Sequence, residues 1–339
     1  MAAASEGRDP AEELKAEKAP KFADDRDLVR SLIKDFHKRH LSTLRTGHTV
    51  KRELDRHVVA AWGDRDVRSI TRRDVIGLLD KIADSGRVVS ADRVRAYMGK
   101  FFAWCIQRDI LPRSPLAGVK PVARETSRDR VLSDAEVRWL WRACKAEGFP
   151  WGPMGQILLL TGQRLSEVAR MTEGEIEHAL WRLPAARTKN GRAHAIPLSD
   201  AAREVLVSSP RIKSTAGYLF TTSGETAASG FHKAREHLSR RMAEIASKER
   251  GEPVSFDHWT FHDLRRTAAT GMARMGIPVR VTEAVLNHVS GTGGGIVAVY
   301  QRHDFADEKR AALDAWARMV LQLVEGAGGN VVRLAEARL

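Results

Sequence analysis

Apolar side chains in the first third of the chain recur at the three- and four-residue spacing of amphipathic helices. Three of these series are Leu28, Leu32, Ile33 and Phe36; Val50, Leu54, Val58 and Trp62; and Val94, Tyr97, Met98, Phe101 and Cys105. A further helix opens at Thr71, where Asp74 three residues on completes a capping box. The pattern predicts a small all-α domain over residues 24–116.

The pattern then breaks and starts again. Three prolines and scattered charges follow Leu111, which favours a linker, and we place it at residues 117–130. Ser133 with Glu136 forms a second capping box, so we expect a second domain over residues 131–325. Residues 1–23 and 326–339 have little apolar periodicity and are expected to be flexible tails.

The second domain also contains two short segments with the character of strands, residues 179–183 and 193–198. Between them lies Asn190-Gly191, a dipeptide typical of two-residue β-hairpins because both positions tolerate positive φ. The remainder has helical periodicity up to Glu325. The predicted fold class is therefore mostly α, with an all-α first domain and a small β-sheet or hairpin in an α+β second domain.

Composition and charge narrow the function. A chain of 339 residues that is 43% hydrophobic is long enough for about two domains with cores. The formal net charge of +13 points to a polyanionic partner such as nucleic acid, although on charge alone an ordinary basic protein remains open. Cys105 and Cys144 are isolated and predict reduced core thiols in a cytosolic protein. The sequence shows no metal-binding cysteine or histidine pattern, signal peptide or membrane-spanning run.

Candidate chemistry lies in five motifs of the second domain. In chain order they are Thr161-Gly162-Gln163-Arg164, Thr188-Lys189-Asn190-Gly191, His262-Asp263-Leu264-Arg265, Leu286-Asn287-His288 and Val299-Tyr300-Gln301-Arg302. Taken singly, each key residue is also typical of an ordinary structural position, and Arg192 competes with Lys189 for its role. A glycine run at Gly291–Gly295 lacks the P-loop spacing and is interpreted as a tether for Tyr300.

Together, two arginines, two histidines, a lysine and a tyrosine suit one reaction, the attack of a tyrosine on a phosphodiester. In this order the motifs resemble the catalytic signature of the tyrosine recombinases, the phage integrase family, and most of all integrases of proteobacterial prophages and genomic islands. The resemblance assigns the family's catalytic positions to Arg164, Lys189, His262, Arg265, His288 and Tyr300. Asn287 stands where the family often has glycine.

The resemblance implies a mechanism. Tyr300 would form a 3′-phosphotyrosyl bond and release a 5′-hydroxyl, with Arg164, Arg265 and His288 stabilising the phosphate. Lys189 would be the general acid and His262 would accept the tyrosine proton. No cofactor and no metal are expected.

It also implies partners and a location. The expected partners are double-stranded DNA at recombination sites and accessory DNA-bending or directionality factors. The protein is expected to be a monomer or weak oligomer when free and a homotetramer on paired DNA sites. The expected location is the bacterial cytoplasm, in association with the nucleoid.

Four points stay open. A type IB topoisomerase uses similar residues, and a catalytically silent DNA-binding protein would keep the charge without the chemistry. Such integrases usually carry an N-terminal arm-binding domain, for which residues 1–23 leave no room, so this member lacks one or the chain is a fragment. A helix after Tyr300 carries an apolar stripe that packs either within its own subunit or on a neighbour; the stripe is Leu313, Trp316, Val320 and Leu323.

Overall fold

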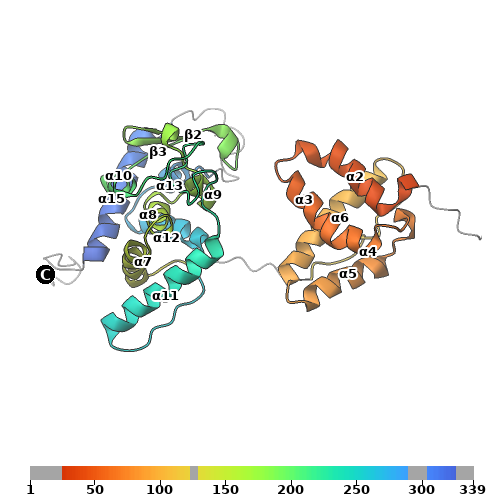
Figure 1. Cartoon of the computed structure of the whole chain (residues 1–339), viewed down its shortest axis with the longest axis horizontal. Helices are drawn as coiled ribbons and strands as arrows, with labels where there is room; N and C mark the ends of the chain where they lie inside the picture. The colour runs from red at the N-terminus through yellow and green to blue at the C-terminus, as the bar shows by residue number, and fades with distance from the viewer. Residues whose placement is uncertain (1–24, 123–128, 289–303, 326–339) are drawn as a thin grey trace, which may run out of the picture. The chain divides into compact units, whose positions relative to one another are not determined.

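The chain divides into two compact units, Met1–Ser127 and Arg128–Leu339 (Figure 1). The computed structural model describes residues 25–122, 129–288 and 304–325. The predicted tails at residues 1–23 and 326–339, the glycine run Gly291–Gly295 and the candidate nucleophile Tyr300 lie outside these ranges. None of the helices within the described ranges is long and apolar enough to cross a membrane.

The first unit is all-α, as predicted. Its α-helices are α2 (Val29–Arg39), α3 (Gly47–Leu54), α4 (Ala60–Trp62), α5 (Arg72–Asp84) and α6 (Val88–Ile106). A π-helical segment at Asp55–Val59 joins α3 to α4, and short 3-10 turns lie at Asp25–Asp27, Leu41–Thr43 and Val67–Ser69. The capping box of Thr71 and Asp74 is present at the start of α5. Phe36, Leu54 and Phe101 are fully buried in one shared core, which confirms the helical periodicity.

Ordered contacts with this unit continue beyond its last helix. Leu116 and Val119 pack against its apolar core. Arg95 Nη1 donates to the carbonyl of Val119 (3.3 Å), and the backbone N–H of Val122 donates to Asp92 Oδ1 (2.7 Å). The side chains of α6 therefore hold the chain to this unit as far as residue 122.

The second unit is built around one central helix. Its elements are α7 (Asp134–Glu147), α8 (Trp151–Thr161), α9 (Leu165–Ala169), a 3-10 turn at Glu173–Glu175, β1 (Ile176–Glu177), β2 (Leu180–Leu183), a 3-10 turn at Ala185–Arg187, β3 (His194–Pro197), α10 (Asp200–Ser208), α11 (Phe231–Arg250), α12 (Phe261–Arg274), α13 (Val279–Val285) and α15 (Ala306–Glu325). Most of α8 is buried, because α7, α10, α12 and α15 pack around it (Figure 1).

The end of α8 shows why a glycine stands there. Gly162 caps the helix in the left-handed region, with φ +63°, which glycine adopts without strain. A Cβ atom at this position would also lie 3.1 Å from Leu286 and 3.3 Å from Ala268. The glycine therefore turns the chain sharply and lets the α8 end approach α12 and the residues after α13.

The sheet is antiparallel with strand order β1-β2-β3, and Leu183 pairs with His194 at its open end. The prediction of a sheet is confirmed, but the predicted two-residue hairpin at Asn190-Gly191 is wrong. The connection spans residues 184–193, and of this dipeptide only Gly191 has positive φ, +70°. Pro184 directly follows β2 and has no N–H to extend the ladder, so the strands separate well before the dipeptide. The short strand β1 was not predicted.

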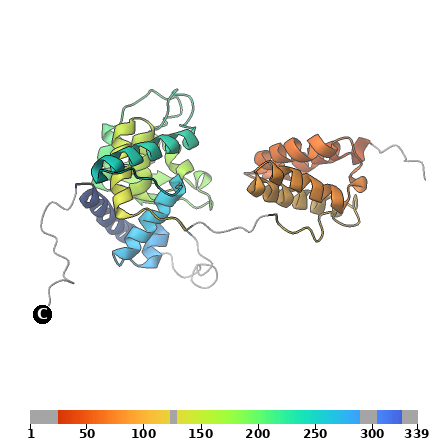
Figure 2. The same ribbon diagram turned by 90° about the horizontal axis from the view of Figure 1, so that it is seen from below.

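The apolar stripe of α15 packs within its own unit. Leu313, Trp316 and Val320 are buried, and the indole N–H of Trp316 donates to the carbonyl of Leu159 in α8 (2.8 Å). A Cβ atom on Gly271 of α12 would lie 2.1 Å from the Trp316 ring, so the ring occupies space that only a glycine leaves open. Figure 2 shows α15, in dark blue, along the edge of the unit. Of the two open possibilities, the structure has the one in which the helix packs in cis.

We expect Trp316→Ala to destabilise the second unit by about 3–5 kcal/mol, because it creates a cavity beside α8 and leaves the Leu159 carbonyl without its donor. Urea unfolding followed by tryptophan fluorescence or circular dichroism measures the change. Arg318→Ala, on the exposed side of the same helix, is the matched control and should change stability by less than about 0.5 kcal/mol. Equal stability of the two variants would contradict the packing role of Trp316.

Candidate active site

Four of the motif segments meet at the C-terminal end of α13. The last carbonyls of a helix have no partner within the helix, and they carry the negative end of its dipole. Here they accept hydrogen bonds from side chains of distant segments: Gln163 and His194 on Val285 O (2.8 and 2.9 Å), Arg265 on Leu286 O (2.5 Å) and Asn190 on Asn287 O (3.1 Å). We call these three carbonyls the α13 carbonyl end.

Arg265 is the most buried of the five described candidate residues, with 6% of its surface exposed. It lies in the first turns of α12, which begins where Asp263 accepts from the backbone N–H and hydroxyl of Thr260 (2.7 and 2.9 Å). Its Nη1 donates to Gly162 O (3.0 Å) and its Nη2 to Leu286 O. Burial and the nearby charge of Arg164 lower the pKa of Arg265 to about 10, so the group remains charged at neutral pH.

Arg164 immediately precedes α9 and is held by Glu167. The Glu167 carboxylate accepts from the backbone N–H of Arg164 (3.1 Å) and from its Nη1 (3.0 Å). Glu167 is almost fully buried, whereas 18% of the Arg164 side chain is exposed. The guanidinium is thus fixed from its inner side, while its outer side stays accessible.

His262 lies on the same first turn as Arg265 but at the surface. Partial desolvation of its ring and the positive charges of Arg266, Arg265 and Arg164 lower the pKa of His262. At neutral pH the imidazole is therefore uncharged and able to accept a proton. Arg266 forms an ion pair with Asp263 (2.6 Å). Of the two arginines in this turn, Arg265 is the buried one.

Lys189 lies in the connection between β2 and β3, where it is exposed. The neighbouring Asn190 holds this connection against the α13 carbonyl end, because its Nδ2 donates to Asn287 O (3.1 Å) and Asn287 Oδ1 (2.8 Å). Arg192, the rival for the role of Lys189, is exposed as well, and its backbone N–H donates to Asn190 Oδ1 (3.1 Å). The position of Lys189 is therefore set by its neighbour.

His288 directly follows the α13 carbonyl end. Its backbone N–H donates to Glu283 O (2.9 Å), its Nδ1 lies 4.0 Å from Glu283 Oε1, and 59% of its side chain is exposed. The structure therefore places Arg164, Lys189, His262, Arg265 and His288 on segments that meet around one helix end. Tyr300, the sixth predicted residue, lies outside the described residues.

His194 and Lys309 belong to the same region and were not singled out in the sequence. His194 is buried, and because its partner Val285 O only accepts, its Nε2 carries the proton. Burial outweighs this hydrogen bond and lowers the pKa of His194 to about 4. Lys309 of α15 is buried and donates to Ala195 O of β3 (3.0 Å). A buried histidine or lysine amid apolar neighbours gives no distinctive pattern, and only their long-range partners identify them.

The charges of this region are unbalanced. Within the described ranges Glu167 pairs with Arg164, but Arg265 forms no salt bridge and uses two of its five N–H groups on backbone carbonyls. A buried guanidinium without a carboxylate partner keeps N–H groups available for hydrogen bonding and an uncompensated positive charge. Both favour the binding of an anion. A phosphate group has the charge and the acceptor oxygens that match them.

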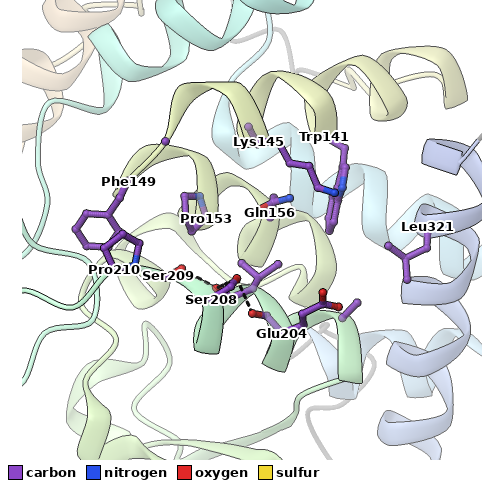
Figure 3. A pocket seen from close by; sticks show the side chains of 14 residues that line it. Trp141, Lys145, Phe149, Pro153, Gln156, Glu204, Ser208, Ser209, Pro210 and Leu321 are labelled. Carbon is purple, nitrogen blue, oxygen red and sulfur yellow. Dashed lines mark hydrogen bonds between the residues drawn. The ribbon is translucent and has the colours of Figure 1, made fainter.

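A separate cavity of about 350 Å³ lies between α7, α8, α10 and α15. Figure 3 shows Trp141, Lys145, Gln156, Glu204 and Leu321 around it. No candidate residue of the site lines this cavity. The chemistry suggested by the motifs therefore does not belong to it.

The family comparisons cover nearly all of the described chain. The sequence model of the phage integrase family matches residues 130–306, and that of the phage integrase central domain matches residues 27–121. Prophage integrase IntA of Escherichia coli K12 is 21% identical over 275 residues, which cover 79% of this chain and 63% of that protein. Prophage integrase IntZ of the same strain is 25% identical over 287 residues, covering 82% and 67%. The chain thus spans about two thirds of the length of these curated relatives.

Solved structures share the fold. A lambda integrase tetramer bound to a Holliday junction aligns with a TM-score of 0.62 at 19% identity, covering 86% of this chain and 84% of that one. A dimer of lambda integrase residues 75–356 bound to a COC′ core site aligns with a TM-score of 0.61 at 19% identity, covering 79% and 97%. The mostly α fold with a small sheet is confirmed.

His194 makes stability depend on pH. Its folded-state pKa of about 4 lies below the ordinary 6.5, so the neutral form stabilises the fold above pH 6.5 and that contribution is lost as the pH falls toward 4. We expect a loss of about 2 kcal/mol between pH 7.5 and pH 5. His194→Gln keeps an N–H donor for Val285 O without titrating, so urea unfolding of the variant should lack this part of the pH dependence. Identical slopes for both proteins would show that His194 does not titrate on unfolding.

Proposed function

The chain belongs to the phage integrase family, and from this premise we propose that it is a site-specific DNA recombinase. It cleaves and rejoins DNA through a 3′-phosphotyrosyl intermediate and so integrates or excises a mobile element. The observation that carries the proposal is the buried Arg265, which has no carboxylate partner among the described residues and lies beside Arg164 at the α13 carbonyl end. The relatives named above are prophage integrases, which supports the same class of reaction.

The guanidinium groups bind the scissile phosphate. Arg265 has three N–H groups left after its bonds to Gly162 O and Leu286 O, and Arg164 adds its accessible side. Both are oriented before DNA binds, so little reorganisation is needed when negative charge grows on the non-bridging oxygens. The exposed ring of His288 supplies a further donor.

The chemical steps are two transesterifications. The Tyr300 oxygen attacks phosphorus in line and passes its proton to His262, whose lowered pKa keeps it neutral. The bond from phosphorus to the 5′-oxygen breaks, and Lys189 gives that oxygen a proton. A 5′-hydroxyl of the partner strand then attacks the phosphotyrosyl bond and releases Tyr300. The number of phosphodiester bonds is conserved, so no nucleoside triphosphate is consumed.

Double-stranded DNA at recombination sites is the proposed partner, and a tetramer on two paired duplexes is the proposed assembly. The net charge of +13 supports DNA binding. Similar folds were solved as a dimer on a core site and as a tetramer on a Holliday junction. The stripe of α15 is buried in cis, so subunits would contact one another through other surfaces.

Tyr300→Phe tests the function directly. We expect this variant to bind core-site DNA with nearly unchanged affinity but to form no covalent complex, because the ring lacks the attacking oxygen. The measurement is the SDS-resistant protein–DNA band on a nicked suicide substrate, with the wild-type chain as the positive control. A band of normal strength from the variant would mean that another residue is the nucleophile.

Strand exchange between two marked duplexes by the wild-type chain separates a recombinase from a topoisomerase, which only relaxes supercoils.

Lys189→Ala tests the general acid. On ordinary DNA we expect cleavage to slow on the order of a hundredfold or more, because the 5′-oxygen leaves unprotonated. A substrate with sulfur at the 5′-bridging position should restore most of the rate, since a thiolate leaves without a proton. Arg192→Ala, measured in parallel, examines the rival residue. Equal impairment of Lys189→Ala on both substrates would remove the acid role from Lys189.

A further inference from the structure

We propose that Asn190 and Asn287 form an interlock that positions Lys189 beside His288, and that both asparagines are positioning residues for cleavage. The inference rests on the proposed function, because it concerns the placement of the proposed general acid. Asn190 follows Lys189 directly and Asn287 precedes His288 directly. One side-chain pair thus connects the nearest neighbours of two site residues that are far apart in the sequence.

The interlock is reciprocal. Asn190 Nδ2 donates to both Asn287 O (3.1 Å) and Asn287 Oδ1 (2.8 Å). Asn287 Nδ2 in turn lies 3.4 Å from Asn190 Oδ1 and 3.5 Å from Arg192 O. Asn190 Oδ1 also accepts from the backbone N–H of Arg192 (3.1 Å), so one amide shapes the turn and ties it to α13.

Among the described residues, the loop has no other such attachment. In the described part of the chain, every hydrogen bond that leaves residues 189–193 ends on Asn287. All five loop residues are exposed, so apolar burial does not hold them either. Without the bonds to Asn287, no hydrogen bond from elsewhere in the described residues would hold the stretch from Lys189 to Ala193, and Lys189 would sample many positions.

The backbone at Asn287 explains which residue can do this. Its φ is +47°, in the left-handed region where glycine is unstrained and asparagine is the better tolerated of side-chain-bearing residues. Glycine would fit this backbone but would remove the side-chain amide of the interlock. Asn287→Gly therefore removes the three bonds made by the Asn287 side chain and keeps the Asn287 O acceptor and the chain path, which makes it a selective test.

The first experiment probes the free protein. Cleavage after Lys189 by a lysine-specific protease reports detachment of the loop, and cleavage after the exposed Lys213 serves as the internal reference. We expect Asn287→Gly and Asn190→Ala each to raise the Lys189 rate by up to about tenfold. The double variant, in which no interlock bond remains, should raise it by less than the product of the two single effects, and the control Ala193→Ser should match wild type. A Lys189 rate that is unchanged in both single variants would overturn the interlock.

The second experiment reads the chemistry. Both asparagine variants should bind core-site DNA as wild type does, cleave ordinary DNA about tenfold more slowly, and recover on the 5′-bridging sulfur substrate as Lys189→Ala does. Slower cleavage without recovery would overturn the positioning role while Lys189→Ala still recovers. If Lys189→Ala does not recover on the sulfur substrate, Lys189 is not the general acid and that part of the proposed function is wrong. The interlock is then tested by the protease cleavage rates of the single and double variants.

Discussion

The site depends on the carbonyls at the end of a short helix, which have no hydrogen-bond partner within the helix itself. α13 ends at Val285, and the carbonyls of residues 285–287 receive side chains from the α8 end, β3, α12 and the loop after β2. Each donor comes from a segment that also carries, or adjoins, a candidate catalytic residue. A buried carbonyl without a partner costs about 1–3 kcal/mol, so the contacts at the buried Val285 O are strongly favoured in the folded chain. Together with the bond from Arg265 to Leu286 O, they order the site before any DNA is present.

That arrangement has an electrostatic cost. Arg164, Arg265 and Lys309 lie close enough to His194 to lower its pKa, and Arg164 lowers the pKa of Arg265. The region limits the cost by keeping His194 neutral and by placing buried Glu167 under Arg164. It does not remove it, since Arg265 has no carboxylate partner in the described chain. A phosphodiester would complete the balance, which is why the same charge that disfavours folding favours the proposed substrate.

The parts of this fold that the sequence predicted are local. The capping boxes at Thr71 and Ser133 and the helical periodicity of the first unit depend on residues three or four apart, and each is present. The Asn190-Gly191 hairpin failed because the strands separate at Pro184 and the Asn190 side chain bonds Asn287, 97 residues away. Contacts of that range have no signature in one sequence. The motifs named five described site residues, but the roles of Gln163, His194 and Lys309 came from the structure alone.

The packing of α15 has a consequence for assembly. Lys309 donates to β3 and Trp316 to α8, so the first half of α15 is fixed on the same unit that holds the arginines. His288, the last described residue before Tyr300, is likewise attached to α13. The chain on both sides of the tyrosine segment is therefore anchored beside one site. Because the apolar stripe of α15 is buried in the core of its own unit, contacts between subunits in a tetramer would have to use other, solvent-exposed surfaces.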